Sequence, residues 1–131
     1  MAPTDAPPDR RYSKDHEWAL ERDGEIVVGI TAFAVDQLGD ITLVALDVKP
    51  GDAVTAGSAF GTIESVKTLA DLFSPVSGTV ARVNTALEQQ PELVNEDCWE
   101  KGWMIAIRPS AAAPALMDAG AYGKLVRESA H

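Results

Sequence analysis

Short apolar runs, some of them alternating with polar residues, recur along the chain, and turn residues such as Gly, Pro and Asp-Gly separate them. Alternation with a period of two, bounded by turn residues, is typical of half-buried β-strands. Residues 17–21 show this alternation, and 41–46 is a strongly apolar run. Further strands are expected over 25–30, 59–64, 69–73, 78–83 and 103–107. Because many short strands with tight turns form small sandwiches or barrels, the pattern predicts a mainly β fold.

One short helix is expected within this pattern, over residues 32–38. Thr31 is a suitable N-cap, because its hydroxyl can accept a hydrogen bond from a free N–H of the first helical turn. Gly39 is suited to end the helix, since glycine readily adopts a positive φ. The segment 84–102 is rich in turn residues and is predicted to be mostly loop.

The two ends of the chain differ from its middle. Residues 1–10 are rich in Pro and Asp, and we expect a disordered leader there, followed by a single domain over 11–131. The tail 114–127 carries apolar residues at near-helical spacing. Gly120 and Gly123 lower its helix propensity, so the tail should form two short helices.

Composition limits the kinds of partner. The 131 residues suit one domain, and 11 basic against 20 acidic side chains give a net charge of −9. Such a charge argues against nucleic acid and against an anionic membrane surface as partners. No apolar run approaches the ~20 residues of a membrane-spanning helix. A single cysteine, Cys98, and two histidines predict neither an internal disulfide nor a metal cluster.

Lys67 is the residue most suggestive of function. It is the only basic residue between Lys49 and Arg82, and it lies at a small polar turn between the predicted strands 59–64 and 69–73. An amine displayed at the tip of a rigid hairpin is suited to covalent attachment of a swinging cofactor. From the spacing alone, a solvated turn lysine is an equally good interpretation.

Several short motifs occur in an order that is highly specific when they are taken together. They are Tyr12-Ser13-Lys14-Asp15-His16-Glu17-Trp18, Gly29-Ile30-Thr31, Gln37-Leu38-Gly39-Asp40-Ile41, Glu64-Ser65-Val66-Lys67, Ser74-Pro75-Val76-Ser77-Gly78, Pro91-Glu92-Leu93-Val94-Asn95 and Gly102-Trp103-Met104-Ile105. From Tyr12 to Val126 the chain resembles the H proteins of the glycine cleavage system. The resemblance implies a barrel-sandwich hybrid, the two-sheet fold of lipoyl and biotinyl carriers, with a short internal helix and C-terminal helices.

The resemblance also implies a cofactor, lipoate, joined to Lys67 through an amide. Glu64 matches the lipoylation motif and would aid recognition by the lipoate-attaching enzymes; a solubilising charge at a strand end is the alternative. Val66 and Ser65 complete the motif. The Ser65 hydroxyl would either face the returning arm or satisfy the turn backbone.

A second set of residues is expected to form a cleft for the arm. By resemblance, His16, Glu17 and Asp71 would line it, and a partly exposed Glu17 carboxylate would neutralise the amine carried on the arm. Its contribution should be modest if the side chain is partly in water. Asp15 stands where the family has Ser, which changes a hydrogen-bonding group into another negative charge.

By resemblance, the chain would be a non-catalytic, monomeric carrier in the bacterial cytoplasm. Its lipoyl arm would take the aminomethyl group of glycine from the pyridoxal-phosphate-dependent P protein to the T protein, and the flavin-dependent L protein would reoxidise it. Other interpretations are an H-like relay of lipoyl groups, a lipoyl or biotinyl domain of another multienzyme complex, and a small enzyme or structural domain. Biotinyl domains usually have Met on both sides of the lysine, where this chain has Val66 and Thr68.

Overall fold

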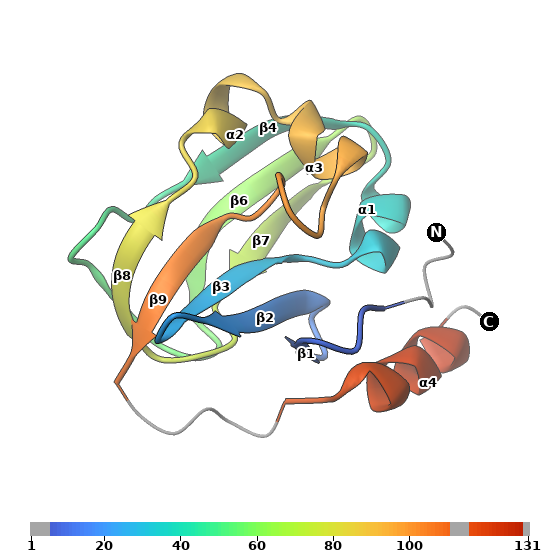
Figure 1. Cartoon of the computed structure of the whole chain (residues 1–131). Helices are drawn as coiled ribbons and strands as arrows, with labels where there is room; N and C mark the ends of the chain where they lie inside the picture. The colour runs from blue at the N-terminus through green and yellow to red at the C-terminus, as the bar shows by residue number, and fades with distance from the viewer. Residues whose placement is uncertain (1–5, 111–115, 130–131) are drawn as a thin grey trace.

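The computed structural model describes residues 6–110 and 116–129, and within them nine strands form two antiparallel sheets (Figure 1). The larger sheet has the order β1 (Arg11–Tyr12), β2 (Glu17–Arg22), β3 (Glu25–Ile30), β9 (Ile105–Pro109), β8 (Gly78–Val83) and β5 (Ala53–Val54). The smaller sheet has the order β4 (Ile41–Leu46), β6 (Ala59–Ser65) and β7 (Leu69–Phe73). The mainly β, two-sheet fold expected from the sequence is confirmed.

The main hydrophobic core lies between the two sheets. Val28 and Ile105 of the larger sheet and Val44 and Ile63 of the smaller one belong to it, and each is at most 2% exposed. A second apolar cluster, which includes Val27 of β3, packs against the C-terminal helix. Because β3 buries side chains on both of its faces, its sequence is almost continuously apolar instead of alternating.

The predicted internal helix is present as α1 (Ala32–Leu38). The Thr31 hydroxyl accepts a hydrogen bond from the Ala34 N–H at 3.3 Å, and Gly39 ends the helix with φ 78°. Both cap residues therefore act as the sequence predicted. Asp23 and Gly24, at φ 55° and 80°, form the turn that pairs β2 with β3.

The structure contains four short elements that the sequence did not predict. The segment 84–102 contains two short helices, α2 (Ala86–Gln89) and α3 (Glu92–Glu96), which anchor Leu87 and Val94 in the core at 0% exposure. Helices this short show no periodicity in the sequence. The strands β1 and β5, with two residues each, were missed for the same reason.

The tail forms a single helix, α4 (Ala119–Ser129), instead of two. Asp118 caps it by accepting the Ala121 N–H at 2.8 Å. Burial of Tyr122 and Val126 against the larger sheet, at 0% and 1% exposure, outweighs the low helix propensity of the internal glycines. Residues 114 and 115 of the predicted tail lie outside the described residues.

The segment before β1 is ordered at least in part. Arg10 is 5% exposed, and its guanidinium lies 4.7 Å from the Trp18 ring centroid and 5.5 Å from that of Trp99. It also donates a hydrogen bond to the Trp99 carbonyl at 2.9 Å and pairs with Asp9. Arg10, the last residue of the leader expected over 1–10, thus packs against the domain, and residues 1–5 lie outside the described residues.

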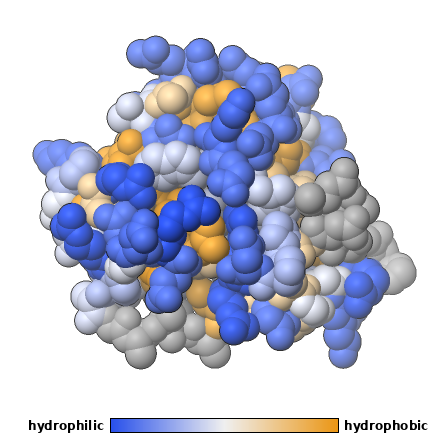
Figure 2. Space-filling model, in the orientation of Figure 1, coloured by the Kyte–Doolittle hydropathy of each residue, from blue (hydrophilic) through white to orange (hydrophobic). Residues whose placement is uncertain are grey.

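Much of the visible surface is hydrophilic, with apolar side chains showing in patches between polar ones (Figure 2). Among the described residues, no helix has both the length and the apolar character needed to cross a membrane.

Candidate functional site

Lys67 lies at the tip of the β6–β7 hairpin. The two strands pair up to Glu64 and Leu69, and the Ser65 N–H donates to the Thr68 carbonyl at 2.8 Å, which closes a tight turn. The turn leaves Lys67 exposed to solvent. The hairpin therefore displays the amine as the sequence predicted.

Ser65 holds the backbone of this turn. Its hydroxyl accepts hydrogen bonds from the N–H groups of Lys67 and Thr68, both at 3.2 Å, and donates to the Thr68 carbonyl at 3.3 Å. The side chain is 8% exposed. Of the two roles considered for Ser65, satisfaction of the turn backbone is the one its contacts support.

Hydrogen bonds from outside the hairpin also hold the turn, and we call this set, which joins Val66, Asp40 and Asn95, the brace. The Val66 N–H donates to the Asp40 carbonyl at 3.0 Å. On either side of Asp40, the Asn95 amide donates to the Gly39 carbonyl at 3.0 Å and accepts the Ile41 N–H at 2.9 Å. Asn95 belongs to α3, so a helix remote in sequence fixes the segment that fixes the turn.

The aliphatic stem of Lys67 lies over Gly39. A Cβ atom at Gly39 would be 3.3 Å from Cε of Lys67 and 3.7 Å from Cγ2 of Val66. Since Gly39 also has φ 78°, any side chain there would be strained as well as crowded. The glycine that ends α1 thus also makes room for the lysine.

An acid between two apolar side chains lies next to the turn. Glu64 pairs with Leu43 of β4 on one side and with Leu69 of β7 on the other. Leu43 is 47% exposed and Leu69 63% exposed, and Val66 at the turn is 66% exposed. Large exposed apolar side chains gathered in one place commonly mark a contact surface.

A cleft of about 360 Å³ is bounded by residues of α1, β7 and the start of β2. His16, Glu17 and Asp71 line it, so the structure brings the three predicted cleft residues together. Phe33 and Ile63 contribute apolar surface. Lys67 does not line the cleft, but Leu38 does, and it directly precedes the glycine over which the lysine lies.

Glu17 is buried rather than partly exposed, at 2% of its surface. Its Oε1 accepts a hydrogen bond from the Ser13 hydroxyl at 2.6 Å, and its Oε2 accepts the Phe73 N–H at 3.5 Å. Burial raises the pKa of Glu17 to about 7, and the charge of Asp15 also raises it, while the hydrogen bonds from Ser13 and Phe73 oppose the shift. The cleft therefore contains a carboxyl group that loses its proton near neutral pH.

His16 is half-buried and has an unusual backbone conformation, with φ 69°. Its carbonyl accepts the Thr31 N–H at 3.0 Å. The ring packs against Phe33, with centroids 4.8 Å apart, and Nδ1 is 2.8 Å from the Tyr122 hydroxyl. Burial lowers the pKa of His16, and the charge of Asp15 partly opposes this. Asp71 is exposed on β7.

We expect Glu17→Gln to flatten the pH dependence of stability. With its pKa raised from 4.5 to about 7 on folding, the carboxyl keeps its proton in the folded protein where the unfolded chain has lost it. The resulting stabilisation is complete below the unfolded pKa and disappears as pH rises through the folded pKa. At ~1.4 kcal/mol per pKa unit, the loss is on the order of 3 kcal/mol.

Urea unfolding between about pH 5 and about pH 8 measures this difference. The parent protein should lose more stability over that interval than the variant does. The comparison isolates Glu17, because the titration of His16 is common to both proteins. Parallel stability curves would show that the Glu17 carboxyl is ionised in the folded protein throughout.

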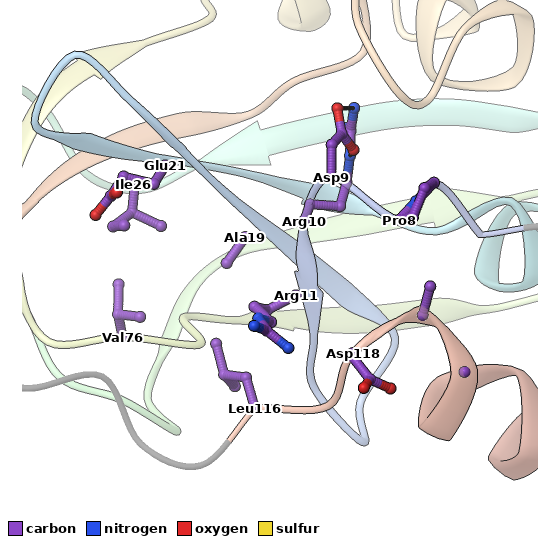
Figure 3. Close-up of a pocket in the computed structure, with 12 residues that line it drawn as sticks. Pro8, Asp9, Arg10, Arg11, Ala19, Glu21, Ile26, Val76, Leu116 and Asp118 are labelled. Carbon is purple, nitrogen blue, oxygen red and sulfur yellow. Dashed lines mark hydrogen bonds and ion pairs between the residues drawn. The ribbon is translucent and has the colours of Figure 1, made fainter.

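A larger hollow, of about 690 Å³, lies elsewhere in the fold (Figure 3). Arg11, Glu21, Leu116 and Asp118 are among the residues that line it, from β1, β2 and the segment before α4. It contains none of the predicted site residues, and its opposite charges come from scattered positions. Chemistry and not size therefore identifies the smaller cleft as the candidate site.

Sequence reasoning missed four contributors to this site: Ser13, Asn95, Thr31 as a partner of Tyr122, and Tyr122 itself. Asn95 belongs to a motif that supports the family resemblance, but nothing in that motif indicates which residues Asn95 contacts. Tyr122 precedes two apolar residues of the tail, Leu125 and Val126, by about one helical turn. Its aromatic ring at helical spacing from Val126 was the available signal.

Two antiparallel sheets around one core, with a lysine displayed at a hairpin tip, define the class of barrel-sandwich carrier proteins. A family model described as "Glycine cleavage H-protein" matches residues 10–129. This chain therefore belongs to the glycine cleavage H-protein family.

Individual relatives agree with the family model. The chain is 51% identical over 125 residues to the glycine cleavage system H protein of Anaeromyxobacter sp. (strain K), covering 93% of this chain and 96% of that protein. It is 44% identical over 124 residues to that of Bacillus licheniformis, covering 93% and 97%. The crystal structure of an H protein from Mycobacterium marinum superposes with a TM-score of 0.85 at 36% identity, covering 96% of this chain and all of the other.

Proposed function

We propose that this chain is the non-catalytic lipoyl carrier of a glycine cleavage system, with lipoate amide-linked to Nζ of Lys67. One observation carries the proposal: an exposed lysine at the tip of a braced turn, near a cleft that contains a buried acid. Membership of the family supports the choice of lipoate as the group. The other lysines, Lys14, Lys49, Lys101 and Lys124, are exposed but lie outside such a turn.

The residues around Lys67 fit such a group. The amine is accessible, and the cleft offers Phe33, Ile63 and Leu72 to an apolar chain and Glu17 to a cation at its end. When bound, the lipoyl group would supply a disulfide, the two-electron oxidant for uptake of the aminomethyl unit of glycine at the P protein. The dithiol left after the unit passes on at the T protein would be oxidised back to the disulfide at the L protein. The chain itself positions the arm, shelters the unit that the arm carries and presents it to the partner enzymes.

Each part of the site has its own task in this proposal. The lipoate-attaching enzyme recognises Glu64 between its two exposed leucines and Val66 at the turn, and Ser65 keeps the lysine backbone in one conformation. In the cleft, Glu17 and Asp71 attract a protonated amine, and the apolar wall reduces its contact with water. A buried carboxyl with a pKa near 7 ionises readily when a cation comes beside it.

We also propose the location, the oligomeric state and the partners of this protein. The protein acts as a monomer in the bacterial cytoplasm, where the P, T and L proteins and the lipoate-attaching enzymes are its partners. A net charge of −9 favours encounters with basic docking surfaces on those enzymes.

The test compares protein made with and without a supply of lipoate. We expect the supplied protein to gain the mass of one lipoyl group, located on Lys67 by peptide mapping, and to support glycine decarboxylation with purified P, T and L proteins. The unsupplied protein should do neither. A lipoylated protein that fails in this assay but passes its lipoyl group to other proteins would establish the relay function instead, and absence of any modification would refute both.

A further inference from the structure

The cleft is connected to the C-terminal helix by a chain of three hydrogen-bonding side chains. Nδ1 of His16 lies 2.8 Å from the Tyr122 hydroxyl, and that hydroxyl lies 2.6 Å from Oγ1 of Thr31. Tyr122 and Thr31 are both 0% exposed. Water therefore does not reach these two hydroxyls, and their protons must be placed within the chain itself.

Counting donors and acceptors leaves one satisfactory arrangement. Oγ1 of Thr31 accepts the Ala34 N–H, so its own proton needs an acceptor, and the Tyr122 oxygen is the partner the described residues offer. The Tyr122 proton is then directed to Nδ1 of His16, which accepts it only when that nitrogen carries no proton. In the reverse arrangement His16 donates, Tyr122 donates to Thr31, and the Thr31 proton is left buried without an acceptor.

We infer that Tyr122 is a positioning residue that holds His16 as the neutral Nε2–H tautomer and thereby gives the cleft a fixed hydrogen-bond donor. His16 lines the cleft, its Nδ1 is engaged by Tyr122, and Nε2 has no hydrogen-bond partner among the described residues. The ring orientation is fixed further by Phe33, 4.8 Å away between centroids, and by an edge contact with Tyr122 at 5.6 Å.

Two properties of the surroundings agree with this assignment. Burial raises the pKa of Tyr122 to about 12, so its hydroxyl keeps the proton that it donates. Burial also lowers the pKa of His16, which favours the neutral ring. The charge of Asp15 opposes that neutrality by raising the pKa of His16; Glu17 and Asp71 are the other acidic groups that line the same cleft.

The Nε2–H donor of His16 determines which ligand groups the cleft can bind. A neutral imidazole N–H suits a carbonyl oxygen and not an ammonium group, whereas Glu17 suits the ammonium group. Resting on the proposed function, the cleft then offers two groups to whatever occupies it: His16 donates to an acceptor atom, and Glu17 takes the amine.

Nitrogen-15 NMR of the full-length protein tests the tautomer directly, because the chain has only two histidines, His16 and His131. With His16 assigned by loss of its signals in His16→Gln, we expect one protonated and one unprotonated ring nitrogen, in the pattern of Nε2–H. In Tyr122→Phe, which keeps the ring but removes the hydroxyl, the two nitrogens should become more alike and the titration midpoint should rise. An Nδ1–H pattern or an averaged mixture in the parent protein would overturn the inference.

Tyr12→Phe is the matched control. Tyr12 stacks on Tyr122 with centroids 4.7 Å apart, but its hydroxyl donates to the Pro7 carbonyl, away from His16. This variant should leave the His16 tautomer unchanged; an equal effect of both variants would reduce Tyr122 to a packing residue. On the lipoylated protein, the Nε2 signal should shift relative to the unmodified form. No shift in protein of confirmed lipoyl mass would refute a donor role of Nε2 toward the arm, while missing lipoyl mass would refute the proposed function instead.

Discussion

Lys67→Arg should leave the protein folded and reduce its support of glycine decarboxylation to background. A guanidinium stays charged and does not form the amide that lipoate attachment requires. Because the turn is held by Ser65, Asp40 and backbone hydrogen bonds, it does not depend on the amine. An exposed substitution of this kind changes stability by about 0.5 kcal/mol or less. Intact mass, the glycine–bicarbonate exchange rate and the unfolding temperature measure the three outcomes.

Lys49→Arg is the control for Lys67→Arg, because Lys49 is also exposed and lies in a turn without the brace. It should be lipoylated and active like the parent protein. Lipoyl mass that persists in Lys67→Arg would place the attachment on another lysine, with Lys14, Lys49, Lys101 and Lys124 as the alternatives.

Glu17→Gln should shorten the time for which the lipoylated protein retains its aminomethyl cargo in water, by about ten- to a hundredfold. A hydrogen bond between a buried carboxylate and a cation contributes about 1.5–3 kcal/mol, and each 1.4 kcal/mol is a factor of ten. The sequence alone suggested a modest effect, because it placed Glu17 partly in water. Its 2% exposure removes the screening on which that expectation rested.

The measurement for Glu17→Gln is the rate at which cargo is released without the T protein, after loading from glycine. Glu21→Gln provides a matched control, since Glu21 lies on the same strand but is exposed and away from the cleft. Lipoylation should be equal in all three proteins. Equal release rates would show that Glu17 does not hold the amine.

The longer strands could be predicted because each is a short apolar or alternating run between turn residues, a pattern contained within a few neighbouring residues. The same local view found α1, whose caps are Thr31 and Gly39. It failed for α2 and α3, where a single buried residue in each short helix, Leu87 or Val94, supplies the packing. It failed again for α4, where contacts with a sheet distant in sequence overcome two glycines.

The candidate site also has a part that the local sequence predicts and a part that depends on the fold. Lys67 was identified because the turn that displays it is local, and the cleft residues came from the family resemblance. What determines their state is not local: His16 meets Tyr122 across 106 positions, and Ile41 meets Asn95 across 54. Ser13 is near Glu17 in sequence, but only the fold shows that its hydroxyl points at the carboxyl. Burial of Glu17 is likewise a property of the packed domain.

The brace between Asn95, Asp40 and Val66 fixes the point from which any group on Lys67 is suspended. A hairpin tip ordinarily moves with its two strands, but this one is bonded to a segment outside the hairpin, which is bonded in turn to α3. A flexible arm on Lys67 therefore moves about an attachment point that is fixed relative to the rest of the domain. The docking position of a partner then determines whether the arm reaches its active site. The distance that the arm spans varies only through the flexibility of the arm itself.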